Sequence, residues 1–131
     1  MPHRFSCRVY YEDTDLAGIV YYANYLKFIE RARSEWVREI GVDQVSMKAE
    51  GLVFAVRRVE ADYLAPARFD DLLEVETALR SVTASRIVLN QTVKRGDAAL
   101  FSSVVTLVCV SDFGRPVRIP ADIRAKMDAH D

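Results

Sequence analysis

The 131-residue sequence is poor in the residues that most catalytic and metal sites use. It contains two cysteines, Cys7 and Cys109, and two histidines, His3 and His130. Two isolated cysteines without a CxxC spacing argue against a zinc site and against a redox pair, and we expect two separate buried thiols. Both histidines lie close to a terminus, where a catalytic base is difficult to hold rigidly. Ser-His-Asp and Cys-His sites and a metal centre are therefore disfavoured.

Glycine, net charge and long apolar runs are also limited. The five glycines are too scattered for a phosphate-binding loop or a GxGxxG turn. Eighteen Lys and Arg balance nineteen Asp and Glu, so no charge excess favours a nucleic acid or an anionic membrane as partner. The longest apolar run, Val104 to Val110, is too short to cross a bilayer, and Met1 to Asp15 lacks the apolar core of a signal peptide. We expect a cytoplasmic protein whose chemistry rests on carboxylates, hydroxyls and backbone amides.

Hydrophobic residues make up 50% of the chain and charged residues 28%, which favours a single globular domain over residues 1–131. Alternating or continuous apolar patterns predict five strands, at residues 4–11, 53–63, 72–79, 87–94 and 100–110. The last of these is almost continuously apolar and β-branched, which predicts a central strand buried on both faces. The pair Gly96-Asp97 is typical of a hairpin turn.

Helical periodicity replaces the alternation from Asn24 to Ile40. Apolar residues recur there every three or four positions and form a broad sector, Arg31 and Glu35 are spaced as an ion pair, and Gly41 follows as a C-terminal stop. Pro120 marks the start of a second, short helix. One long helix followed by an antiparallel meander predicts an α+β fold, with the sheet wrapped around the helix.

The segment from Tyr10 to Tyr25 carries the densest chemical signal. Three carboxylates, Glu12, Asp13 and Asp15, precede the start of the long helix. The first N–H groups of a helix have no partner within it, and the helix dipole favours negative charge there. A carboxylate beside such donors provides the two components of ester hydrolysis, a nucleophile or base and a site for an oxyanion. The alternative is structural: Asp13 and Asp15 satisfy turn amides, and Asn24 caps the helix.

Asp15, Gly18, Val20 and Tyr25 fill the pattern Asp-x-x-Gly-x-Val-x-x-x-x-Tyr, and the segment resembles the hotdog-fold 4-hydroxybenzoyl-CoA thioesterase family. Residues 11–15, 30–33 and 63–71 look closer to one branch, the Tol-Pal system-associated acyl-CoA thioesterases. The resemblance implies a hotdog fold, an antiparallel sheet around one long central helix. It also implies hydrolysis of an acyl-CoA thioester without metal or redox cofactor, coenzyme A being part of the substrate.

Carried over by position, the resemblance makes Asp15 the catalytic carboxylate and the backbone N–H of Tyr22 the oxyanion donor. Gly18 would permit the tight turn, and Val20, Asn24 and Tyr25 are candidate substrate-binding residues. Attack by Asp15 itself and activation of a water both remain open. Many members of the Tol-Pal branch have a histidine where this chain has Tyr22. The backbone N–H donor therefore carries over to this chain, but any role of an imidazole side chain does not. The acyl preference stays open.

Further residues have two interpretations each. Arg57, Arg58, Arg68 and Arg86 suit CoA phosphates or solvated strand edges, and we expect Glu30 to pair with an arginine. For Tyr21, Tyr25 and Trp36, a place in the core or at an interface is favoured over a place in an acyl pocket.

The resemblance implies a homodimer with sites at its interface, and a tetramer of two dimers. Acyl carrier protein is a possible partner, and a binding or scaffold role in the cell envelope is the alternative function. An enoyl-thioester hydratase is disfavoured because no histidine lies inside the chain.

Overall fold

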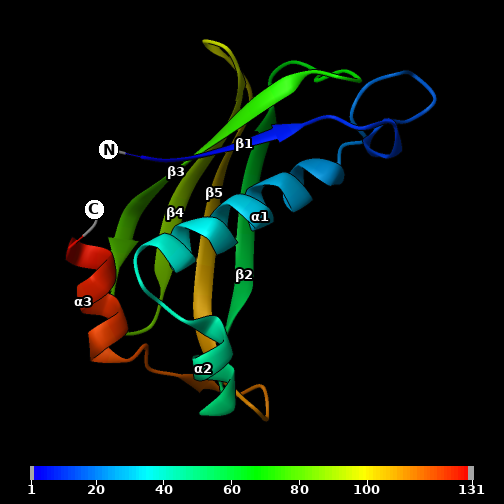
Figure 1. The fold of residues 1–131 in the computed structure, drawn as a ribbon. Coiled ribbons are helices and arrows are strands. Elements are labelled where there is room, and N and C mark those ends of the chain that lie inside the picture. The colour runs from blue at the N-terminus through cyan, green and yellow to red at the C-terminus, as the bar shows by residue number, and fades with distance from the viewer. Residues whose placement is uncertain (1, 130–131) are drawn as a thin grey trace.

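The computed structural model describes residues 2–129, and His130 lies outside the described residues. The chain forms a curved antiparallel sheet with one long helix against it and two short helices at one end (Figure 1). In chain order the elements are β1 (His3–Arg8), a 3-10 turn (Tyr11–Asp13), α1 (Asn24–Glu39), α2 (Gln44–Ala49), β2 (Leu52–Tyr63), β3 (Leu72–Val82), β4 (Ile87–Arg95), β5 (Ala98–Ser111), β6 (Pro116–Val117) and α3 (Ala121–Ala129).

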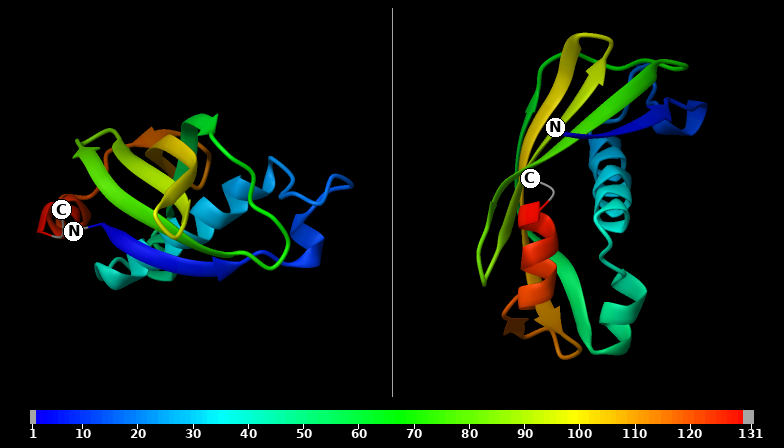
Figure 2. Two further views of the ribbon diagram at one scale, coloured as in Figure 1. Left: turned by 90° about the horizontal axis from the view of Figure 1, so that it is seen from above. Right: turned by 60° about the vertical axis from the view of Figure 1, so that its left-hand side comes forward.

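The sheet has the order β1-β3-β4-β5-β2, and the short β6 pairs with β5. All neighbouring strands are antiparallel. Strands β3, β4 and β5 form the predicted meander, but β2 lies beside β5 rather than beside β3, so a simple four-strand meander was wrong. The β2–β3 connection crosses from one side of the sheet to the other, which places β1 and β2 at its two edges (Figure 2).

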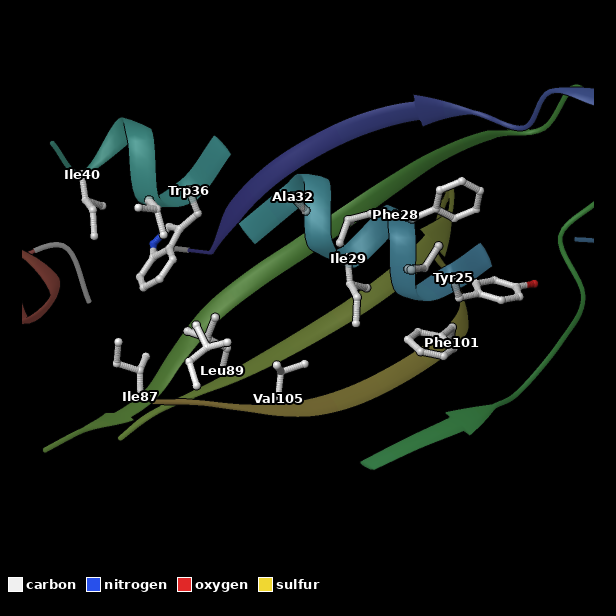
Figure 3. Packing of buried hydrophobic residues seen from close by; sticks show 14 of the residues in the cluster. Tyr25, Phe28, Ile29, Ala32, Trp36, Ile40, Ile87, Leu89, Phe101 and Val105 are labelled. Carbon is white, nitrogen blue, oxygen red and sulfur yellow. The ribbon is translucent and has the colours of Figure 1, made fainter. Parts of the chain in front are cut away.

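Helix α1 runs along the concave face of the sheet, as predicted for a sheet wrapped around one helix (Figure 2). The helix buries one side, and its contacts with the sheet include Phe101 and Val105 of β5 and Leu89 of β4 (Figure 3). The buried helical residues, at the three- and four-residue spacing of one helix face, are Tyr25, Phe28, Ile29, Ala32, Trp36 and Val37. Leu26, another apolar residue of this helix, is 41% exposed. Gly41, with φ of 88°, follows the helix end.

A buried polar cluster ties α1 to the middle of the sheet. The fully buried Gln91 of β4 donates from its amide to the Ile29 carbonyl (2.9 Å) and to Thr77 Oγ1 (2.8 Å). Its side-chain oxygen accepts from Arg33 Nη1 at 3.0 Å. Because a buried amide without partners is costly, these bonds specify where along the sheet the helix lies.

Two predictions about local structure were wrong, and one short helix was missed. Strand β5 is central, but only one of its faces is fully buried: Val105 is inaccessible, whereas Val104 and Val108 on the other face are half-buried. The ion pair of Glu35 forms with Arg38 (2.7 Å) rather than with Arg31. Helix α2 was not predicted, because it has six residues and a single buried anchor, Met47.

Two further expectations concern the cysteines and the C-terminal helix: the thiols are separate, but only Cys109 is buried and Cys7 is partly exposed. Cys7 and Cys109 are free thiols, and burial raises the pKa of Cys7 to about 11. Helix α3 begins directly after Pro120 and buries Ile123 and Met127.

Candidate active site

Asp15 begins a tight turn that is closed by its own backbone and side chain. The Gly18 N–H donates to the Asp15 carbonyl (2.9 Å), and the Ala17 N–H donates to Asp15 Oδ1 (2.9 Å). The Asp15 N–H donates in turn to the Ile19 carbonyl (2.9 Å). Gly18 has φ of 79°, a left-handed conformation that costs other residues free energy. The turn therefore fixes the direction of the Asp15 side chain while one carboxylate oxygen has no partner among the described residues.

The start of α1 is held to this loop through the carbonyl of Asp13. That oxygen accepts from the Tyr21 N–H (2.9 Å) and from Asn24 Nδ2 (2.9 Å). Ala23, not Asn24, occupies the N-cap position, and no side chain caps the helix. The predicted capping role of Asn24 was wrong, because its amide reaches back to the loop instead of to the helical N–H groups.

This uncapped start leaves the backbone N–H of Tyr22 free. Within residues 2–129 no backbone or side-chain acceptor lies within hydrogen-bond distance of it. The group sits at the positive end of the α1 dipole, where an anion or an oxyanion is stabilised.

A cavity of about 410 Å³ brings the two features together. Asp15 and Tyr22 both line it, together with Ile19, Val20, Tyr21, Tyr25, Tyr63, Leu64, Ala65 and Pro66. Of the predicted site residues, Gly18 and Asn24 do not line it. Gly18 belongs to the turn that holds Asp15, and Asn24 bonds to the carbonyl of Asp13. Tyr63 was not predicted, although it falls in the segment 63–71 that carried the family resemblance.

The interior of the cavity is aromatic and uncharged apart from Asp15. Tyr25 is 3% exposed and stacks on Phe101 with a ring-centroid distance of 5.0 Å, and its hydroxyl accepts from the Ala67 N–H (3.0 Å). Burial raises the pKa of Tyr25 and of Tyr63, so both phenols are neutral at physiological pH. Such a surface suits an acyl group. Trp36, in contrast, belongs to the core alone.

The far wall of the cavity is formed by residues 64–66, the start of a loop (residues 64–71) that is clamped by Asp71. Asp71 Oδ2 accepts from the Arg68 N–H (2.9 Å) and from Arg95 Nη1 (2.7 Å). Partial burial pushes the pKa of Asp71 up, but the bonds from Arg68 and Arg95 outweigh it, and the pKa lies below its ordinary value. The Val20 N–H, bonded to the Ala67 carbonyl (2.8 Å), joins this loop to the Asp15 turn.

Replacing Asp71 with Asn is expected to destabilise the protein by about 1 kcal/mol at neutral pH, because the side chain is partly exposed and loses a charge-assisted bond. A depressed folded-state pKa stabilises the protein above the unfolded pKa of about 3.9, and this stabilisation disappears as the pH falls through the folded pKa. Urea unfolding should therefore separate wild type from Asp71→Asn at pH 7 and much less at strongly acidic pH. Asp128→Asn, an exposed site on α3, is the control. An equal difference in the free energy of unfolding at both pH values would contradict the stabilising role of the Asp71 carboxylate.

The candidate anion-binding arginines separate into different places. Arg57 and Arg86 line a second cavity of about 480 Å³, which Arg118 also lines, and none of the three forms an ion pair within residues 2–129. Arg58 instead pairs with Glu60, and Arg68 lies in the loop of the first cavity's far wall. Glu30 accepts from Ser34 Oγ (3.0 Å), so its predicted arginine partner was wrong.

No three or more His, Cys, Asp or Glu side chains within residues 2–129 gather in a way that could hold a metal ion. None of the helices there is long and apolar enough to span a membrane.

A curved antiparallel sheet around one helix, with a carboxylate and free helix-start donors in one aromatic cavity, defines an α+β domain of the hotdog type equipped for acyl transfer. The family model described as the thioesterase-like superfamily matches residues 9–127. The chain therefore belongs to the thioesterase-like superfamily, and the family predicted from the sequence is confirmed.

Individual proteins agree with this membership. The acyl-CoA thioester hydrolase YbgC of Escherichia coli is 39% identical over 125 residues, 94% of this chain and 93% of the relative. The acyl-CoA thioesterase YbgC of Haemophilus influenzae is 40% identical over 92% of this chain and 90% of its own length. Among solved structures, a probable thioesterase from Bartonella henselae superposes with a TM-score of 0.86 at 35% identity, covering 92% of this chain and all of that one.

Proposed function

We propose that the chain is an acyl-CoA thioesterase in which Asp15 is the catalytic carboxylate and the Tyr22 N–H is the oxyanion donor. One observation carries the proposal: Asp15 and Tyr22 line the same aromatic cavity. The curated relatives described above are named acyl-CoA thioester hydrolases or thioesterases, and they match nearly the whole chain.

In this reaction the thioester carbonyl oxygen accepts from the Tyr22 N–H, which stabilises the negative charge that develops on that oxygen. Asp15 either takes a proton from the attacking water or attacks the carbonyl carbon itself, forming an anhydride that water then hydrolyses. In both routes the C–S bond breaks, the thiol of CoA leaves, and the products are the free acid and CoA. The neutral Tyr25 and Tyr63 give the acyl group an uncharged aromatic surface.

A hydrolysis panel tests the proposal. Purified protein is incubated with short-chain, long-chain and aromatic acyl-CoAs, and thiol release is followed with a chromogenic disulfide. Turnover of at least one class, lost in Asp15→Asn, is the expected outcome. A wild-type protein that turns over none of them while binding a cell-envelope partner would favour the scaffold function instead.

We propose that the working unit is a homodimer in which two β2 strands pair. Strand β2 is an edge strand of twelve residues, and its Val53, Val56 and Val59 are at least one-third exposed. Such an edge is a template for a further strand. Dimer and tetramer are distinguished by the mass in solution.

Pairing of β2 with an antiparallel copy would also explain the arginine cavity. Val108 lines the arginine cavity, and Phe101 lies beneath the first cavity. These two residues are seven positions apart on β5, so the two cavities of one chain are separated by about 24 Å. An antiparallel copy places the Leu52 end of one β2 beside the Tyr63 end of the other. We propose that Arg57, Arg86 and Arg118 of one copy hold the phosphates of the CoA whose thioester lies in the other copy's cavity.

A mixing experiment tests this arrangement. Arg86→Gln is expected to raise KM with little change in kcat, whereas Asp15→Asn lowers kcat. If each site combines Asp15 of one copy with Arg86 of the other, co-expressed heterodimers regain one complete site. Heterodimers without any gain over the separate variants would contradict the shared site.

We further propose that the enzyme works in the cytoplasm, needs no cofactor beyond the CoA of its substrate, and serves the Tol-Pal system. Its similarity to proteins named YbgC supports this placement. Loss of Tol-Pal-dependent envelope integrity on deletion, restored by wild type but not by Asp15→Asn, is the expected result.

A further inference from the structure

We infer that Tyr63 is a positioning residue, which holds the oxyanion donor of the neighbouring helix start in place through its hydroxyl. The inference rests on the proposed role of the Tyr22 N–H. The observation behind it is a single bond between distant elements: Tyr63 Oη, at the end of edge strand β2, donates to the backbone carbonyl of Tyr22 at 2.9 Å.

The carbonyl of Tyr22 has no helical partner to hold it. In a regular α-helix it would accept from the N–H of Leu26, four residues on. Here the Leu26 N–H donates to Ala23 (3.2 Å) and the Asn24 N–H to Tyr21 (2.8 Å), so the first turn is tightened. Among the described residues, the Tyr63 hydroxyl is the one donor to the Tyr22 carbonyl.

The bond fixes a backbone unit that has few other restraints. Both the Tyr22 and the Ala23 N–H groups lack an acceptor within residues 2–129. Tyr22 itself is 61% exposed, and its ring contacts are with Tyr21 (4.9 Å between centroids) and Tyr63. Without the Tyr63 hydroxyl, the Tyr22–Ala23 peptide group could rotate so that its carbonyl moves towards Leu26. The Cα of Tyr22, which joins this peptide group to the one that carries the Tyr22 N–H, would then be less restrained.

Tyr63 is 49% exposed, but aromatic contacts and the strand to which it belongs hold its ring. Its ring makes edge contacts with Tyr22 (6.2 Å between centroids), Tyr25 (5.6 Å) and Phe101 (5.1 Å). It lies opposite Phe101 in the β2–β5 register, so its backbone belongs to the sheet. The raised pKa keeps its hydroxyl protonated as a donor. The geometry of the catalytic backbone is thereby set by the sheet and not by the loop alone.

The test is Tyr63→Phe, which deletes the donor and keeps the ring. We expect kcat to fall by roughly tenfold to a hundredfold, as for a small misplacement of a catalytic group, with KM unchanged within about twofold. The shape of the pH–rate profile should not change, because Tyr63 transfers no proton. Tyr11→Phe is the matched control, because it makes the same chemical change in a ring that is 82% exposed. Its kcat and KM should equal those of the wild type.

An NMR signature separates positioning from general loss of structure. The Ala23 amide shares a peptide group with the Tyr22 carbonyl, so its ¹⁵N and ¹H shifts should move in Tyr63→Phe while those of mid-helix residues such as Ala32 stay in place. Unchanged kcat, a rise in KM alone, or an activity loss that only follows loss of folded protein would each overturn the inference. Turnover that depends on Asp15 but not on Tyr63 refutes this inference alone. Wild-type protein without thioesterase turnover refutes the proposed function.

Discussion

Replacing Asp15 with Asn is expected to lower kcat by roughly a thousandfold, because the amide can neither accept a proton from water nor attack a carbonyl. The turn should survive, since an amide oxygen can still accept from the Ala17 N–H as Asp15 Oδ1 does. Folding, assembly and acyl-CoA binding should therefore stay close to wild type. Steady-state kinetics, with a binding measurement on a non-hydrolysable acyl-CoA analogue, separates the two effects.

Glu12→Gln is the matched control, because it makes the same chemical change at an exposed position of the same loop. It should retain the wild-type rate. If Asp15→Asn hydrolyses acyl-CoA at a rate near that of Glu12→Gln, the catalytic group is elsewhere in the cavity.

Truncation of Phe101 to Ala is expected to have the largest effect on stability, about 3–5 kcal/mol. Phe101 is fully buried, stacks on Tyr25 and contacts the ring of Tyr63. Its loss removes apolar contact and leaves a void under the cavity that Asp15 and Tyr22 line, because a close-packed interior relaxes only partly. Urea unfolding followed by circular dichroism measures the change in the free energy of unfolding.

Phe113→Ala provides the comparison, because Phe113 is 90% exposed in the turn after β5. It should change the free energy of unfolding by less than about 0.5 kcal/mol. Equal losses in the two variants would mean that the packing between α1 and β5 does not hold the site. A folded Phe101→Ala protein should also show lower kcat, because Tyr63 loses the ring against which it packs.

Much of the fold was predictable because its elements follow simple periodicities. The strand alternation and the helical repeat located β2 to β5 and α1 with end residues off by a few positions at most. The sheet order was less accessible. Nothing in the local pattern of residues 52–63 distinguishes a partner in β3 from one in β5, because both strands offer apolar inward-facing residues. The choice depends on long-range packing around α1.

The candidate site was predictable in its chain positions but not in its bonds. Asp15, Gly18 and Tyr22 were identified from a short motif and the start of a helix. Asn24 was misassigned, because its amide bonds to a carbonyl eleven residues earlier, a contact that helix-capping preferences do not anticipate. Tyr63 was missed as a site residue because it is separated from Tyr22 by 41 positions, and only the folded sheet brings its hydroxyl to the helix start.

A crystal structure of Asp15→Asn with an intact acyl-CoA bound would test the proposed mechanism most directly. The thioester carbonyl oxygen is expected about 3 Å from the backbone nitrogen of Tyr22, with its carbon facing the side chain at position 15 and its acyl group among the tyrosines. A thioester bound outside this cavity, or turned so that its carbonyl meets other donors, would contradict it.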